Sequence, residues 1–308
     1  MIQIQQIAQL TGHQSPIYTI VCSQKPGILF SAGSDKGVVE WDLINQQFIK
    51  VLFPVQSSVY ALHAPLAHLA PILVAGERSG RVTIFHFEEQ KVTQVLTEHT
   101  SPIFDIKSVA SKKELITCSE DGTVCVYQLD IVSPCSLIKQ FKVSTAGVRV
   151  MAIDPSESKI AFGCKDNLIY VYSLSDYSLL KVLAGHTLGV SSLQFSPDGK
   201  YLLSGGRDAT LKYWDANELS LVKSINAHLF AIYDIAFHPE GHRLATASRD
   251  KSIKLWNAHD FSLIKTISQE KGYPSHRLSV NKISWDPSTH HLISAGDDTN
   301  VLIWDVKL

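Results

Sequence analysis

The chain has 308 residues, with 28 Lys and Arg against 29 Asp and Glu, so its formal net charge at pH 7 is −1. This balance excludes a bulk electrostatic attraction to nucleic acid or to an anionic membrane surface. Hydrophobic residues make up 45% and charged residues 19%, a composition typical of a globular protein with an ample core.

Short apolar runs separated by turn residues recur along the whole chain. The first, Ile2–Leu10, alternates polar and apolar side chains. The clearest example is Leu183–Asp215, in which Pro197 sets one turn dihedral and Gly199 supplies a positive φ. Runs this short and this regularly punctuated indicate antiparallel strands rather than helix. Within this stretch we expect strands at residues 190–195, 201–205 and 211–214.

The end of each three-strand unit is marked by an aromatic residue. The spacings between these residues are 44, 42, 45, 42, 42 and 48. The positions are Trp41, Phe85, Tyr127, Tyr172, Trp214, Trp256 and Trp304. Several units also begin with Gly-His, as at Gly12-His13 and Gly185-His186, and end with Trp-Asp. A period near 43 with these paired signatures resembles the WD-repeat family.

The resemblance covers the whole chain and implies an all-β fold, a seven-bladed β-propeller of four-stranded antiparallel blades. We expect one propeller over residues 1–308, because each blade buries its faces only against its neighbours. In the family, the stretch before each Gly-His is the outer strand of the preceding blade. Residues 2–10 are therefore expected to complete blade seven and to close the ring without an open sheet edge.

The resemblance also implies a buried relay in each blade, in which Asp accepts from His, His bonds a Ser or Thr, and the hydroxyl meets the Trp indole. Four complete sets are present: His13, Ser31, Asp35 and Trp41; His186, Ser204, Asp208 and Trp214; His228, Thr246, Asp250 and Trp256; His276, Ser294, Asp298 and Trp304. Blade three has His99, Thr117 and Asp121 but ends in Tyr127.

Blades two and four depart from this pattern. Both lack the histidine, Ser79 replaces the Asp in blade two, and Phe162 replaces the hydroxyl in blade four. We expect these two blades to rely on hydrophobic packing instead.

His, Ser and Asp in one unit also invite a catalytic-triad interpretation. A hydrolase needs one nucleophile beside an oxyanion hole, whereas here the set recurs in four blades. A network in which every buried polar atom has a partner is a structural device. We therefore predict that the relays are structural, that no residue is catalytic and that the protein is not an enzyme.

The resemblance implies that a partner binds the face that carries the relay turns. One set of positions there follows the first aliphatic residue of each inner strand, and the other precedes the relay Asp. Tyr and Arg are enriched at binding hot spots. The predicted contact residues are Tyr18, Tyr60, Arg78, Phe104, Arg149, Lys165, Arg207, Tyr233 and Arg249. They favour a protein or peptide with an acidic group over blades four to six; alternatively, these cations pair with neighbouring acids such as Glu120.

Two other functions stay open. A propeller hydrolase with a channel metal would need converging carboxylates, for which the inner strands offer Asp105 and Asp234. Single-stranded nucleic acid could bind cations and stacking tyrosines, but the net charge argues against it. We expect no cofactor, no metal and a protein that is monomeric alone.

The five cysteines contain no CxxC pair, so we expect free thiols in a reducing compartment. The first ten residues lack the pattern of a signal peptide, and no apolar run approaches the length of a membrane span. These features predict a cytoplasmic protein, or a nuclear one in a eukaryote.

Overall fold

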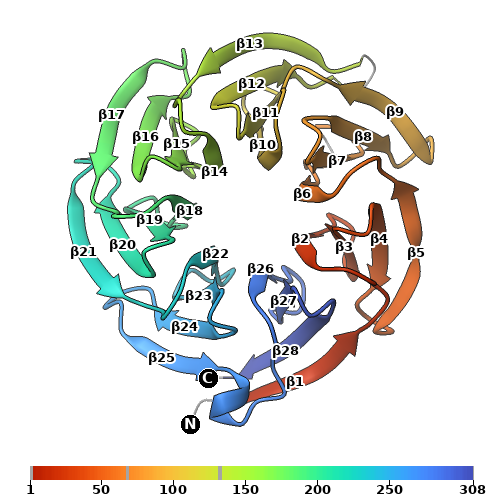
Figure 1. Ribbon diagram of the computed structural model, residues 1–308, viewed down its shortest axis with the longest axis vertical. Coiled ribbons are helices and arrows are strands. Elements are labelled where there is room, and N and C mark those ends of the chain that lie inside the picture. The colour runs from red at the N-terminus through yellow and green to blue at the C-terminus, as the bar shows by residue number, and fades with distance from the viewer. Residues whose placement is uncertain (1–2, 67–68, 131–133, 308) are drawn as a thin grey trace.

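The computed structural model describes residues 3–66, 69–130 and 134–307. Seven four-stranded antiparallel sheets are arranged as blades around a central axis (Figure 1). The first strand of each blade lies innermost and the fourth lies at the rim. The predicted seven-bladed β-propeller is confirmed.

The strands follow one another in chain order within blades one to six. Blades one and two consist of β2 (Ile17–Cys22), β3 (Ile28–Gly33), β4 (Gly37–Asp42), β5 (Gln47–Pro54), β6 (Val59–His63), β7 (Ile72–Glu77), β8 (Val82–His86) and β9 (Lys91–Leu96). Blades three and four consist of β10 (Ile103–Val109), β11 (Glu114–Ser119), β12 (Thr123–Gln128), β13 (Ser136–Lys142), β14 (Val148–Ile153), β15 (Lys159–Cys164), β16 (Leu168–Ser173) and β17 (Leu179–Ala184).

The remaining blades repeat this arrangement. Blades five and six consist of β18 (Val190–Phe195), β19 (Tyr201–Gly206), β20 (Thr210–Asp215), β21 (Leu221–Asn226), β22 (Ile232–Phe237), β23 (Arg243–Ser248), β24 (Ile253–Asn257) and β25 (Leu263–Ile267). Blade seven consists of β26 (Val280–Trp285), β27 (Leu292–Gly296), β28 (Val301–Lys307) and β1 (Gln3–Leu10), and it is preceded by the short helix η1 (Gln269–Lys271).

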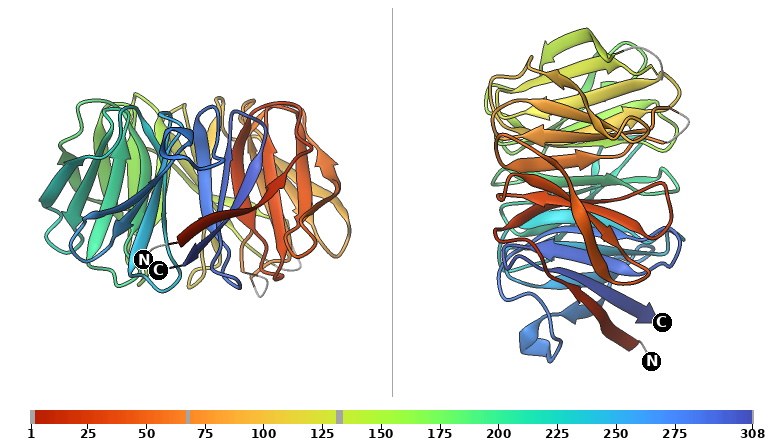
Figure 2. Two further views of the ribbon diagram at one scale, coloured as in Figure 1. Left: turned by 90° about the horizontal axis from the view of Figure 1, so that it is seen from below. Right: turned by 90° about the vertical axis from the view of Figure 1, so that its right-hand side faces the viewer.

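The ring is closed by a strand from the opposite end of the chain. β1 pairs antiparallel with β28, from Gln3 opposite Lys307 to Leu10 opposite Val301, with a one-residue shift in register between Gln6 and Ala8. The two termini consequently lie side by side at the rim of blade seven (Figure 2). Leu10 is buried in the cluster that joins blade seven to Trp41 and Ile17 of blade one. The expected closure is therefore confirmed.

Apolar clusters between neighbouring blades form the core, so each blade contributes both faces to burial. The turn within Leu183–Asp215 forms as expected: the Gly199 amide donates to the Ser196 carbonyl at 2.8 Å, and Gly199 has a φ of 70°. Each third strand is entered through a tight turn whose residue after the relay Asp has positive φ, as at Lys36 and Ala209. All five cysteines are free thiols.

Removing residues 1–10 should lower the melting temperature by at least about 6 °C, because the loss of a single buried leucine costs about 3 kcal/mol and each 1 kcal/mol shifts this temperature by about 2–4 °C. The deletion also leaves β28 as an unpaired edge. Thermal unfolding followed by circular dichroism measures the effect. Substituting the exposed Gln3 and Gln5 with Ala is the control and should change little. An unchanged melting temperature after the deletion would show that β1 does not close the fold.

Candidate functional site

A β-bulge at the second residue of each inner strand positions the first set of predicted contact residues. In blade one the pairing jumps from Ile17 to Thr19, so Tyr18 is left out of the ladder. A bulge bends the strand and redirects the extra side chain. The same jump occurs in every blade, and the bulged residues are Tyr18, Tyr60, Phe104, Arg149, Ser191, Tyr233 and Asn281.

Four of these bulged residues form a continuous row across blades one to four. The ring centroids of Tyr18 and Tyr60 are 5.1 Å apart, and those of Tyr60 and Phe104 are 5.4 Å apart. The Arg149 guanidinium lies 4.0 Å from the Phe104 ring centroid, a cation–π contact. We call Tyr18, Tyr60, Phe104 and Arg149 the aromatic arc. Tyr233, on blade six, makes no ring contact with the arc in the described structure.

The predicted cations divide into two groups. Arg149 Nη2 lies 3.2 Å from Glu120 Oε2, and Lys165 Nζ also pairs with Glu120. Burial lowers the pKa of Arg149; the Glu120 charge opposes this effect and the nearby Arg207 charge adds to it. Glu120 therefore pairs with both of these cations.

The other predicted cations are Arg78, Arg207 and Arg249. All three are exposed, and none has an ion pair with a described residue. Arg249 lies 5.9 Å from the ring centroid of Phe230. Arg207 and Arg249 occupy equivalent turns of adjacent blades, so two of these three cations lie together over blades five and six, and Arg78 lies apart on blade two.

The structure adds an apolar feature that the sequence analysis missed. The loops entering blades five, six and seven each present an exposed apolar side chain two residues after the relay histidine, and blade six adds Leu229 directly after it. Leu229 is 83% exposed and Phe230 is 56% exposed. The set, which we call the apolar ridge, is Leu188, Leu229, Phe230 and Leu278. The signal was available, because the equivalent loops of blades one and three carry Ser and Pro instead.

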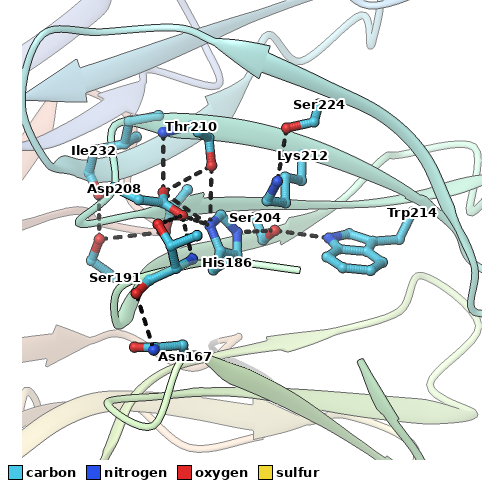
Figure 3. Close-up of polar contacts among 12 residues, drawn as sticks. Asn167, His186, Ser191, Ser204, Asp208, Thr210, Lys212, Trp214, Ser224 and Ile232 are labelled. Carbon is cyan, nitrogen blue, oxygen red and sulfur yellow. Dashed lines mark hydrogen bonds and ion pairs between the residues drawn. The ribbon is translucent and has the colours of Figure 1, made fainter. Parts of the chain in front are cut away.

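Beneath these loops, the relay residues of blade five form a continuous hydrogen-bonded set (Figure 3). His186 Nε2 lies 2.7 Å from Ser204 Oγ, and the Trp214 indole donates to the same oxygen at 2.8 Å. His186 Nδ1 lies 3.0 Å from Asp208 Oδ2. Because the carboxylate can only accept, Nδ1 carries the proton and the Ser204 hydroxyl donates to Nε2.

Blades one, six and seven contain the same contacts. Their indole-to-hydroxyl distances are 2.6, 2.9 and 3.0 Å. In blade three His99 contacts Thr117 and Asp121, but Tyr127 donates to Glu98 at 3.0 Å instead of meeting the hydroxyl. The relay histidine side chains have no exposed surface, and the Ser204 side chain is fully buried. A substrate therefore has no approach to these hydroxyls.

The expectation that blades two and four rely only on hydrophobic packing is wrong. In blade two the buried Glu77 accepts from Thr83 Oγ1 at 2.7 Å and from the Ser57 amide at 3.0 Å. In blade four Asp166 accepts from Ser144 Oγ at 2.6 Å and from Tyr170 at 2.9 Å.

In these two blades, apolar groups replace only the part of the relay farthest from the Asp, where the other blades have the hydroxyl and the indole. The Phe53 ring, from the outer strand of blade one, stacks on the Phe85 ring of blade two at 5.0 Å, and the Phe162 and Tyr172 rings are 5.6 Å apart in blade four. The constant separation of 22 residues between relay His and Asp points to Ser144 as the substitute in blade four. Loop-end polar contacts are thus present in all seven blades.

The carboxylates considered for a channel metal are already engaged. Asp234 Oδ1 lies 2.9 Å from Lys282 Nζ, and its other oxygen accepts from the Ile283 amide. Asp105 lies 3.5 Å from Lys107 and accepts from the amide of Met151. The described residues contain no cluster of three or more His, Cys, Asp or Glu with metal-binding geometry. Helices able to span a membrane are likewise absent from the described part of the chain.

Comparison with known proteins places the chain in a class of repeat propellers. The family WD40, described as WD domain, G-beta repeat, matches residues 4–42, 90–128, 177–215, 219–257 and 267–305. These matches cover more than half of the chain, which therefore belongs to the WD40 repeat family. The unmatched stretches hold most of blades two and four, whose relays are altered. Proteins of this family generally act as non-enzymatic scaffolds for protein interaction.

Two characterised proteins illustrate the relationship. The chain is 28% identical over 140 residues to COMPASS component SWD3 of Saccharomyces cerevisiae, a match covering 43% of each protein. It is 28% identical over 104 residues to guanine nucleotide-binding protein subunit beta-like protein 1 of Mus musculus, covering 34% of this chain and 32% of the relative. The chain thus matches less than half the length of these curated relatives.

Replacing Ser204 with Ala should lower the free energy of unfolding by about 1–3 kcal/mol, because the His186 and Trp214 nitrogens lose their shared partner. Urea denaturation followed by tryptophan fluorescence measures the loss. Ser204→Thr is the matched control, since Thr246 holds this position in blade six, and it should lose less. Equal stability of the Ala and Thr variants would show that the hydroxyl contributes nothing.

The relay acids should make the fold sensitive to low pH. Burial alone raises the pKa of Asp208 and Asp250, but hydrogen bonds from His186 and His228 outweigh it, and both pKa values lie well below the ordinary value. Burial also lowers the pKa of His228, although the bond to Asp250 opposes this. A lowered folded-state pKa gives stability that is present above the unfolded pKa and is lost as pH falls.

We therefore expect the free energy of unfolding to decrease from pH 7 to pH 3, most steeply below about pH 4, where unfolded carboxylates become protonated. Urea denaturation at several pH values measures this. Asp250→Asn should be less stable at pH 7 and should show a shallower decrease. A flat profile between pH 5 and pH 3 would contradict the assignment.

Proposed function

We propose that this chain is a non-enzymatic scaffold that binds a protein or peptide across the face carrying the relay turns. The observation that carries the proposal is the combination, on this face, of the aromatic arc, the unpaired Arg207 and Arg249, and the apolar ridge. Exposed apolar groups beside cations and tyrosines are typical of interfaces rather than of solvated turns.

The partner's chemistry follows from this distribution. Arg149 and Lys165 are both held by Glu120, whereas Arg207 and Arg249 lie on adjacent blades and have no ion pair with a described residue. A carboxylate or phosphate group of the partner would be held there, since guanidinium groups bind these anions in a bidentate way. An apolar side chain of the partner would pack against the neighbouring ridge, where Phe230 lies close to Arg249.

A single propeller can serve several partners through such a face, because its loops vary while its blades stay fixed. Here each relay Asp holds the residue that follows the relay histidine, in the loop that enters its blade. The Asp208 carboxylate accepts from the Thr187 amide at 2.8 Å, and the Asp250 carboxylate accepts from the Leu229 amide at 3.0 Å. The exposed apolar groups are therefore presented on a preorganised surface, which reduces the entropy lost on binding.

The two alternative functions lack a comparable observation. A channel-metal hydrolase would have to use Asp105 and Asp234, whose oxygens already pair with lysines and backbone amides. Binding of single-stranded nucleic acid would need a longer row of free cations than Arg207 and Arg249 provide.

The double variant Arg207→Glu, Arg249→Glu should lose most of the partner captured by the wild-type protein from its native source. We expect at least a tenfold decrease by quantitative mass spectrometry, because two attractive charges become repulsive. Its melting temperature should stay close to that of the wild type, since both side chains are exposed.

A matched control carries the same change of charge on the opposite face. Lys25 and Lys113 are exposed and lie in the loops between the first and second strands of blades one and three. The Lys25→Glu, Lys113→Glu variant should capture the partner as the wild type does. If the arginine variant captures the same proteins in the same amounts, the partner does not use this face.

A further inference from the structure

On the face opposite the relay turns, a groove with a volume of about 410 Å³ opens between blades five and six. Its lining comes from the β18–β19 loop, the β22–β23 loop and the β24–β25 turn. Tyr201, Phe237 and Phe261 provide aromatic surface. This volume lies within the range of small-molecule sites, which are mostly apolar with a few polar groups.

A buried hydroxyl without a partner belongs to this lining. Tyr213, on β20, is fully buried, and its hydroxyl has no hydrogen-bond partner in the described structure. Burying such a group without a partner is unfavourable. Five of the other six blades place an aliphatic residue here: Ile84, Val126, Val171, Leu255 and Ile303. The apolar core between the blades therefore does not require the hydroxyl.

Two imidazoles also line the groove. His242 Nδ1 and His259 Nε2 are 3.3 Å apart, so one ring donates to the other, and the other side-chain nitrogen of each ring has no described partner. Each of the two acids of the lining has a basic neighbour. Asp198 lies 3.2 Å from Lys200, which also lines the groove, and Glu240 lies 3.9 Å from His238. His242 and His259 are both exposed, so a ligand can contact their rings without any change in the protein core.

We propose that this groove binds a small aromatic acid that carries a neutral oxygen at the end opposite its carboxylate. The ring would lie among Tyr201, Phe237 and Phe261, and the neutral oxygen would accept the Tyr213 hydroxyl proton. The carboxylate remains near water at His242 and His259, because burying a charge beside a single donor is far more costly than burying a neutral oxygen.

Entry requires a local side-chain movement. The ring centroid of Phe261 lies 3.8 Å from that of Tyr213, and the Tyr213 hydroxyl is closed to solvent. Phe261 lies in the β24–β25 turn rather than in a strand, so its ring can move aside without disturbing a sheet. This proposal is independent of the protein-binding function, because it concerns the other face of the propeller.

The test uses 3-(4-hydroxyphenyl)propionate as the probe, with two matched compounds. 3-Phenylpropionate lacks the phenolic oxygen, and tyramine carries a cation in place of the carboxylate. Isothermal titration calorimetry on the full chain should show binding of the probe, at least fivefold weaker binding of 3-phenylpropionate, and no binding of tyramine.

Tyr213→Phe separates the role of the hydroxyl from that of the groove. The free variant should melt at the same temperature as the wild type or higher, because the unpaired hydroxyl is gone. It should bind the probe and 3-phenylpropionate with equal affinity. His259→Asn, which places the residue found at the equivalent Asn217 of blade five, should weaken both acids by a similar factor.

Several results would overturn the proposal. These are no binding of the probe at millimolar concentration, an undiminished preference for the probe in Tyr213→Phe, or a lower melting temperature of that variant without ligand. The Arg207→Glu, Arg249→Glu variant should bind the probe as the wild type does. The experiments therefore distinguish a wrong proposal of small-molecule binding in the groove from a wrong proposal of partner binding on the opposite face.

Discussion

The whole structure depends on closing a ring of sheets that cannot bury their faces individually. Each blade packs against two neighbours, and the apolar clusters lie between blades rather than within them. One missing contact would expose two sheet faces at once. The pairing of β1 with β28 provides the last contact, because it joins the two ends of the chain in one sheet and leaves Leu10 buried against blade one.

Closure also fixes where side chains can be displayed. The bulge at the second residue of every inner strand repeats around the ring, so one local irregularity directs seven side chains in the same way. The relays add a second constraint beneath this face, since the relay Asp of blades three, five, six and seven accepts from an amide of its own turn and from an amide of the loop that enters the blade. The bulges and the relays thereby define the backbone of this face, and its chemistry depends on which residues occupy these positions.

Much of the fold was predictable from the sequence, because a pattern that is ambiguous at one position becomes clear when it recurs along the chain. One apolar run such as 211–214 is weak support for a strand, but the same run at a period near 43 defines the fold and the position of β1. The bulged positions were equally predictable, because their place relative to the first aliphatic residue of the inner strand is constant.

The sequence offered Glu120 as a partner for the cations, but it did not identify which cations pair with it. Arg149 and Lys165, which share Glu120, lie about 30 to 45 residues further along the chain, and the curvature of the ring brings the three side chains together. The substitute networks of Glu77 and Asp166 were not predicted, because the missing histidines suggested apolar packing. A serine at the histidine position instead satisfies the loop end with different groups. The sequence shows the apolar residues at positions 229 and 230, whereas their exposure follows from the packing of the folded loops.

The sequence repeat and the blade are out of phase, since the match over residues 4–42 joins the outer strand of blade seven to the three inner strands of blade one. Each duplicated unit therefore donates a strand to the blade before it. During evolution, copying or losing one whole unit would change the number of blades by one and still leave every sheet with four strands. Partial duplication would leave a gap. Propellers with different numbers of blades can thus arise from one another while every intermediate keeps the pairing of its first strand with its last blade.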